Sequence, residues 1–196
     1  QMSEALRRDR MTGSKYWAES FAGFLELSAA PLKDFLTAED TMHRCDVGLL
    51  DLIGELGEFA VKGGEGETFF HVMRSAADKT GLAVFRFLAA WTAMNCGDLE
   101  TCVEECEKVD EPFSSVNTLH GQALLELGRP REALETLDIA TTLAPSELLA
   151  WFQKAKALHI LGRSREAVLA LQECQRLDSQ SDEVAAYIAM IAAETE

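Results

Sequence analysis

The sequence predicts an all-α fold, an α-solenoid of antiparallel helix pairs with an N-terminal helical region and a C-terminal capping helix. Three observations support this prediction. Two consecutive segments repeat the same pattern of residue types at a constant offset. Apolar residues recur at helical spacing within each repeat. Finally, 47% of the 196 residues are apolar, which is enough to build a core.

The repeat lies in residues 119–145 and 152–179. The aligned pairs are Gly128 with Gly162, Arg129 with Arg163, Ala133 with Ala167, Leu137 with Leu171 and Leu143 with Leu177. Each unit is expected to be a helix, a turn at the glycine and a second helix, because glycine accepts a positive φ without a steric penalty. The alanines are expected where the two helices cross closely. The four leucines are expected on the face of the second helix that packs on the first.

This pattern resembles the tetratricopeptide repeat, a helix–turn–helix unit of about 34 residues with characteristic small, glycine, large apolar, alanine and proline positions. In residues 114–147 the matching positions are Gly121, Gly128, Ala133, Leu137, Ala140 and Pro145. In residues 148–181 they are Trp151, Ala155, Gly162, Ala167 and Leu171, while Cys174 replaces the last alanine and Ser179 the proline. The resemblance implies a tetratricopeptide-like solenoid.

The pattern weakens toward the N-terminus. Residues 83–113 are predicted to form a unit shortened at its exit turn, and residues 48–79 a degenerate unit in which Phe69 stands where a small residue belongs. Residues 1–47 are expected to form further helices outside the repeats. Residues 182–196 are expected to form the capping helix, with Val184, Ile188 and Ile191 on one face. The predicted organisation is therefore an N-terminal segment 1–47, repeats over 48–181 and a cap over 182–196.

The stretch that contains Cys96, Cys102 and Cys106 is rich in acidic residues and raises the question of a metal or redox site. Cys102 and Cys106 align with the packing positions Ala133 and Leu137, so we expect them to be buried like small apolar residues. Their spacing lacks the closely paired ligands of zinc sites. The acidic residues are expected on a solvated outer face, and the less constrained Cys96 and Cys45 are the candidates for a thiol switch.

Composition and charge argue against several functions. The net charge of −15 would repel phosphate backbones, so nucleic acid is not expected as a partner. No apolar run approaches the roughly 18 residues of a membrane span, and the start of the chain lacks a secretory signal. Free cysteines favour a reducing compartment, so a cytoplasmic location is expected. Without a nucleophile motif, a phosphate-binding loop or a metal-ligand pattern, we expect no enzyme activity, no cofactor and no metal.

The resemblance implies where a partner would bind. In tetratricopeptide arrays the first helix of each unit lines a concave groove that contacts a partner peptide. The groove positions transferred by alignment are Val84, Phe87, Trp91 and Met94 in the first group, Ser115, Thr118, Gln122 and Leu125 in the second, and Leu149, Phe152, Lys156 and His159 in the third. Their apolar members either anchor a partner's apolar side chains or pack within the array.

Chaperone-binding members of the same family hold a peptide's C-terminal carboxylate with cationic and amide side chains in the groove. The matching positions here are Phe87, Trp91, Leu119, Leu149 and Gln153, and none of them is a cation. A bound carboxylate would be desolvated without a charged partner. That binding mode is therefore not expected.

We interpret the chain as a non-catalytic protein-interaction module that binds a partner peptide or helix with apolar anchor residues, as a secretion-type chaperone or an adaptor. The alternative is a structural scaffold subunit of a larger assembly. In that case the apolar faces would mediate permanent contact with other subunits or with a second copy of the chain, as a homo-oligomer.

Overall fold

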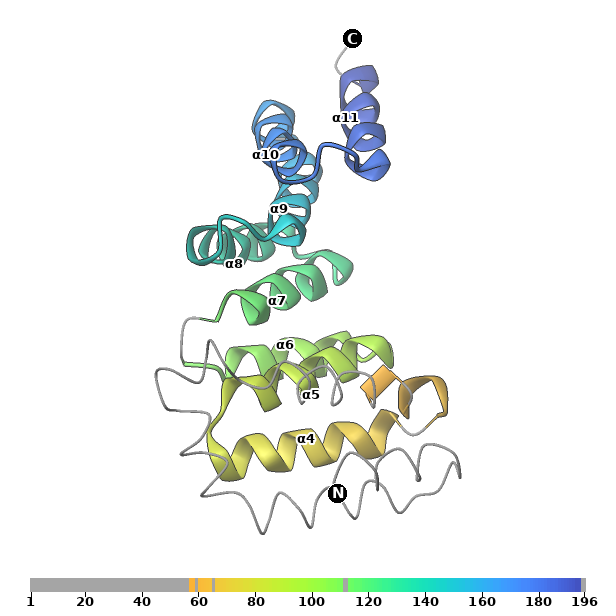
Figure 1. Ribbon diagram of the computed structural model, residues 1–196, viewed down its shortest axis with the longest axis vertical. Coiled ribbons are helices and arrows are strands. Elements are labelled where there is room, and N and C mark those ends of the chain that lie inside the picture. The colour runs from red at the N-terminus through yellow and green to blue at the C-terminus, as the bar shows by residue number, and fades with distance from the viewer. Residues whose placement is uncertain (1–56, 59, 65, 111–112, 195–196) are drawn as a thin grey trace. The chain divides into compact units, whose positions relative to one another are not determined.

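A computed structural model of the chain describes residues 57–58, 60–64, 66–110 and 113–194. The described residues form helices and no strand, and Figure 1 labels the helices α4 to α11. The predicted all-α fold is confirmed. The helices predicted within 1–47 lie outside the described residues, as does Cys45. The chain divides into two compact units, residues 1–98 and residues 99–196, which are described separately.

In the first unit, α4 (Gly66–Thr80) and α5 (Ala83–Asn95) pack against each other. Their core includes the fully buried side chains of Phe69 and Met73 on α4 and of Phe85 on α5. Phe69, which occupies a position where a small residue was expected, is thus a central core residue of this unit.

In the second unit, α6 (Leu99–Glu107) precedes two helical hairpins and a final helix. The first hairpin pairs α7 (Ser114–Glu126) with α8 (Pro130–Leu143), and the second pairs α9 (Leu148–Ile160) with α10 (Ser164–Leu177). The first hairpin contacts the second through α8 and α9, and α11 (Asp182–Glu194) packs on α10. Val184 and Ile191 of α11 are buried, so this helix covers apolar surface at the C-terminal end of the repeats.

The two repeated turns have the same geometry. Gly128 and Gly162 both adopt φ of +74°, a left-handed conformation that a residue with a Cβ rarely adopts. The next residue in each turn donates its backbone N–H to the preceding helix, from Arg129 to Leu124 at 2.8 Å and from Arg163 to Leu158 at 2.9 Å. These bonds satisfy carbonyls at the helix end that have no intrahelical partner.

Each hairpin interior is built from the predicted small and large residues. Ala133, Leu137, Ala167 and Leu171 are fully buried. In the first hairpin α7 and α8 approach each other closely at Gly121. A Cβ added there would lie 2.9 Å from Cδ1 of Leu137 and nearer still to its Cγ and Cδ2 atoms. A side chain at this position of α7 would therefore overlap Leu137 of α8.

The prediction for Leu143 was wrong. Its side chain is 42% exposed, whereas Leu137 on the same helix is fully buried. Six residues of an α-helix turn through about 600°, which places Leu143 roughly 120° away from Leu137 around the helix axis. The two leucines consequently cannot share one packing face.

The cysteines lie where the repeat alignment placed them. Cys102, Cys106 and Cys174 are buried and reduced, and Cys96 is exposed. The predicted burial of Cys102 and Cys106 is confirmed. None of the helices in the described ranges has the length and apolar character of a membrane span.

Candidate interaction surfaces

Two of the buried thiols, those of Cys106 and Cys174, are held in their protonated form. The pKa of Cys106 is raised, first by a hydrogen bond with the Cys102 side chain and then by burial. Burial raises the pKa of Cys174 to about 11. Because the thiolate is the nucleophile and the metal ligand, these groups are poorly suited to either role at neutral pH. No three His, Cys, Asp or Glu side chains converge on a possible metal position in the part of the chain that the structure describes.

The first predicted group of groove residues lies on α5. Val84 and Phe87 are half-buried and pack against the core of the first unit. Trp91 is half-buried beside Gly57, where an added Cβ would lie 3.1 Å from the indole ring. Met94 is half-buried near the end of the helix. A substantial part of this apolar surface is therefore used for packing within the unit.

The second group lies on α7. Thr118 is only 2% exposed, and its hydroxyl donates to the backbone carbonyl of Ser114 at 3.0 Å. Gln122 and Leu125 are half-buried, and the Gln122 amide donates to Glu126 at 3.3 Å. On this helix Gln122 and Leu125 retain surface that a partner could contact, whereas Thr118 serves the helix itself.

The third group lies on α9 and is partly covered by α11. Phe152 is only 5% exposed, and its ring meets Tyr187 of α11 edge to face with 5.7 Å between ring centroids. The ring of Tyr187 also lies beside that of His159, with 5.7 Å between the ring centroids. The Lys156 ammonium lies 4.8 Å from the centroid of the Phe152 ring. Leu149, at the start of the helix, is 47% exposed. Of the large apolar residues among the predicted groove positions on α9, Leu149 is the more exposed.

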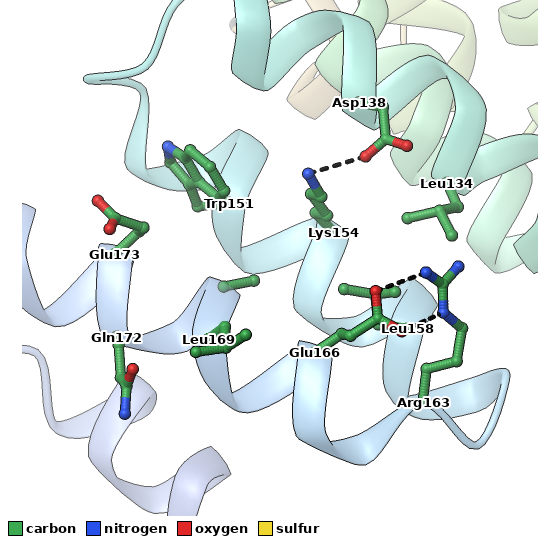
Figure 2. A pocket seen from close by; sticks show the side chains of 11 residues that line it. Leu134, Asp138, Trp151, Lys154, Leu158, Arg163, Glu166, Leu169, Gln172 and Glu173 are labelled. Atoms are coloured by element: carbon green, nitrogen blue, oxygen red, sulfur yellow. Dashed lines mark hydrogen bonds and ion pairs between the residues drawn. The ribbon is translucent and has the colours of Figure 1, made fainter.

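A cleft of about 500 Å³ lies among α8, α9 and α10 and is bordered by a different face of α9 (Figure 2). Trp151, Lys154 and Leu158 contribute to it from α9. Each follows a predicted groove residue by two positions, and two positions on an α-helix correspond to about 200° of rotation. The cleft and the predicted groove thus lie on opposite sides of α9.

The walls of this cleft are held by ion pairs and an aromatic contact. Lys154 of α9 donates to Asp138 Oδ1 of α8 at 2.8 Å and places its ammonium 5.0 Å from the centroid of the Trp151 ring. The Trp151 indole N–H donates to the Pro145 carbonyl at 2.9 Å, which fixes the ring orientation. Figure 2 shows the Lys154–Asp138 pair bridging the two helices.

The second polar element of the cleft is a fork between Arg163 and Glu166. Arg163 donates through Nε at 2.7 Å and Nη2 at 2.6 Å to the two carboxylate oxygens of Glu166. This interaction lowers the pKa of the Glu166 carboxyl and raises the pKa of the Arg163 guanidinium. Arg129 and Glu132 form the same fork one repeat earlier, so the fork belongs to the repeated turn.

The sequence reasoning did not identify this cleft. In the sequence Trp151 is a match to the repeat pattern, and nothing distinguishes Asp138 and Lys154 from the other charged residues. The available signal was the pair of opposite charges at Asp138 and Lys154, but two charges on different helices do not indicate contact by themselves. The covering role of Tyr187 was missed for the same reason.

His120 occupies on α7 the repeat position that Lys154 occupies on α9, one unit later. Its Nε2 atom is buried and has no hydrogen-bond partner among the described residues. The pKa of His120 is lowered from its ordinary value of 6.5, chiefly by burial and also by Arg129, while Glu107 and Glu132 act in the opposite direction. Burial thus disfavours the imidazolium in the folded chain.

The protein is expected to lose stability below about pH 6.5 because of His120. The unfolded chain takes up a proton on this residue before the folded chain does, so the free energy of unfolding falls as the pH drops through this window. His120→Gln should make the decline between about pH 7.5 and pH 5 shallower. Urea denaturation at a series of pH values measures it, and an equally steep decline in the variant would contradict the expectation.

Comparisons with known proteins place these helices in context. Residues 73–183 match a family model described as the bacterial transcriptional activator domain. No curated protein matches the chain. Among solved structures, MamA from Desulfovibrio magneticus RS-1 is similar with a TM-score of 0.64 and 16% identity, over 74% of this chain and 85% of that one.

Two further structures show the same fold. PilF from Pseudomonas aeruginosa has a TM-score of 0.64 and 20% identity, over 74% of this chain and 68% of that one. The first tetratricopeptide domain of Spaghetti (RPAP3), bound to the HSP90 peptide SRMEEVD, has a TM-score of 0.56 and 16% identity, over 58% of this chain and 92% of that one. The predicted tetratricopeptide-like solenoid fold is confirmed by these similarities.

Proposed function

The chain belongs to the bacterial transcriptional activator domain family, and from this membership we propose that it is a non-catalytic protein-binding module of a transcriptional regulator. Its role is that of an adaptor in the cytoplasm, which contacts another protein and leaves DNA binding to other domains or partners. A net charge of −15 supports the assignment of DNA binding to other domains or partners, because the surface field of this chain repels a phosphate backbone. Family membership favours the adaptor over a secretion-type chaperone.

The protein-binding part of this proposal rests on the exposed apolar residue on the groove side of α9. Leu149 is 47% exposed at the start of that helix. On α7, Gln122 and Leu125 are the half-buried members of the predicted groove. An apolar anchor surrounded by adaptable polar groups suits a helix or an extended peptide from a partner.

The groove is not suited to the carboxylate-binding mode of peptide recognition. Leu119 and Gln153 are buried, and Leu149 is apolar, so three of the five positions that would hold a terminal carboxylate offer no exposed polar group. A peptide that ends in an acidic residue would be desolvated there without compensation. We propose instead that the partner inserts apolar side chains.

A matched pair of substitutions tests the groove. Leu149→Glu is expected to abolish binding of apolar peptides selected on a peptide array, because it places a carboxylate where the anchor binds. Leu143→Glu is the control, since Leu143 is 42% exposed and lies on α8 outside the predicted groove. Both variants should keep the unfolding midpoint of the unchanged chain. Equal peptide binding by the two variants would disprove the groove assignment.

A further inference from the structure

Lys156 of α9 is the one lysine or arginine among the predicted groove positions. It is half-buried, and it forms no ion pair with any carboxylate that the structure describes. Its ammonium lies instead 4.8 Å from the centroid of the Phe152 ring. Three other lysines behave differently, since Lys62, Lys108 and Lys154 each pair with a carboxylate, at 3.0, 2.7 and 2.8 Å. Within the described ranges, the chain thus supplies no counter-charge for Lys156.

The packing of the repeats does not require a cation at this position. One repeat earlier the equivalent residue of α7 is Gln122, and one repeat later the equivalent residue of α11 is Met190. All three helices form with different residue types there. The Gln122 amide donates to Glu126 of its own helix at 3.3 Å, whereas Lys156 has no hydrogen-bond partner among the described residues. The positive charge at position 156 therefore calls for an explanation other than packing.

The ammonium of Lys156 is positioned by the helices around it. It lies beside the ring of Phe152, which is 5% exposed and meets Tyr187 of α11 edge to face. A cation is attracted electrostatically to an aromatic ring, and this ring is itself held by its neighbours. A charge that is already positioned loses less conformational freedom when a partner binds. Lys156 is therefore preorganised to meet an anionic group.

Lys156 shares one face of α9 with Leu149, the exposed apolar residue of the groove. The step of seven residues turns the helix through about 700°, so the two side chains lie about 20° apart around the axis and about 10 Å apart along it. We propose that the partner carries an internal aspartate or glutamate about 10 Å from its apolar anchor, and that Lys156 pairs with this carboxylate. Such a separation corresponds to about three residues of an extended peptide or about seven of a helix. This pairing rests on the groove binding proposed above and specifies the chemistry of the partner.

Other kinds of partner fit this face less well. A basic segment would bring like charges together at Lys156. Nucleic acid and strongly acidic segments are repelled by the net charge of −15. A single carboxylate in an otherwise uncharged segment largely avoids that repulsion, because exposed charges farther away than about 8 Å are screened at physiological salt. An uncharged segment would cover the ammonium without replacing its lost hydration.

The test starts from an apolar peptide that binds the full chain on the array and no longer binds Leu149→Glu. The peptide is synthesised with both ends capped, so that no terminal carboxylate contributes, and with glutamate, glutamine or lysine at each position in turn. Fluorescence anisotropy at physiological salt compares the affinities. At a position about three or about seven residues from the anchor, glutamate should bind about three- to tenfold more tightly than glutamine, and lysine more weakly than both.

Three variants of the protein assign this preference to its residue. Lys156→Gln should abolish the preference for glutamate, and it should fold because α7 carries glutamine at the equivalent position. Lys156→Glu should reverse the preference in favour of lysine. Lys154→Gln is the matched control, because it removes the same charge from the opposite side of α9, where Lys154 pairs with Asp138. This control should retain the preference.

Four results would overturn the pairing. They are no position at which glutamate binds more tightly than glutamine, a preference that persists in Lys156→Gln, an equal loss of preference in Lys154→Gln, and self-association of the chain that Lys156→Glu abolishes in analytical ultracentrifugation. The last would assign this face to a second copy. If Leu149→Glu keeps all peptide binding, the groove itself is wrong and the pairing fails with it. If Leu149→Glu abolishes binding and glutamate is not preferred, the groove stands and only the pairing fails.

Discussion

Replacing Gly121 with valine is expected to destabilise the chain by about 1–3 kcal/mol, and by more if Leu137 cannot move. Any Cβ at position 121 overlaps the outer carbons of Leu137 on α8, and Leu137 is fully buried in a closely packed interior. The loss should appear as a lower midpoint in urea denaturation with an unchanged slope. Gln122→Val, at the adjacent half-buried position of α7, controls for the cost of a β-branched residue in the helix.

A double-mutant cycle identifies the cause of that loss. Leu137→Ala alone should cost about 2–5 kcal/mol, because it leaves a cavity in the hairpin interior. In the double variant the valine can occupy part of that cavity, so the combined loss should be smaller than the sum of the two single losses. Strict additivity would show that the contact between Gly121 and Leu137 does not limit the packing of α7 on α8.

Replacing Phe152 with alanine is expected to cost about 3–5 kcal/mol of stability. Phe152 is 5% exposed and packs against Tyr187, so its removal loses both buried apolar area and the aromatic contact that holds α11. Urea denaturation measures the loss. Hydrogen exchange should also show reduced protection of the amides of Asp182–Glu194.

Leu149→Ala provides the comparison on the same helix. Because Leu149 is 47% exposed, its truncation should change stability by no more than about 0.5 kcal/mol. If Phe152→Ala were as stable as Leu149→Ala, Phe152 would be a contact residue awaiting a partner. The expected difference assigns Phe152 to packing and Leu149 to the surface proposed for binding.

Much of the fold was predictable because its determinants are local and repeated. The glycine turns, the alanine crossings and the leucines at positions 137 and 171 recur at one fixed offset, and a residue's side of a helix follows from its number. The same reasoning predicted the burial of Cys102 and Cys106, which the structure confirms. It failed at Leu143 because the helical spacing was applied over six residues, where it does not hold.

The side chains of the candidate surfaces were harder to predict. Their exposure depends on contacts between helices that are distant in the chain. The repeat positions of Thr118 and Phe152 predict that both residues line a groove. In the structure the hydroxyl of Thr118 donates to a backbone carbonyl of its own helix, and Tyr187 of the final helix covers Phe152. No repeat position specifies what a capping helix will cover.

The all-α class, the repeated helix pairs and the residues of the hairpin interiors follow from the amino-acid sequence, because helical periodicity and the special backbone freedom of glycine act over a few residues. Which apolar residues stay exposed follows only from the packing of the helices. It brings Asp138, Lys154 and Trp151 together from two helices and leaves Leu169 exposed beside them. Solvent exposure and ion pairing depend on neighbours in space, which helical periodicity along the chain does not specify.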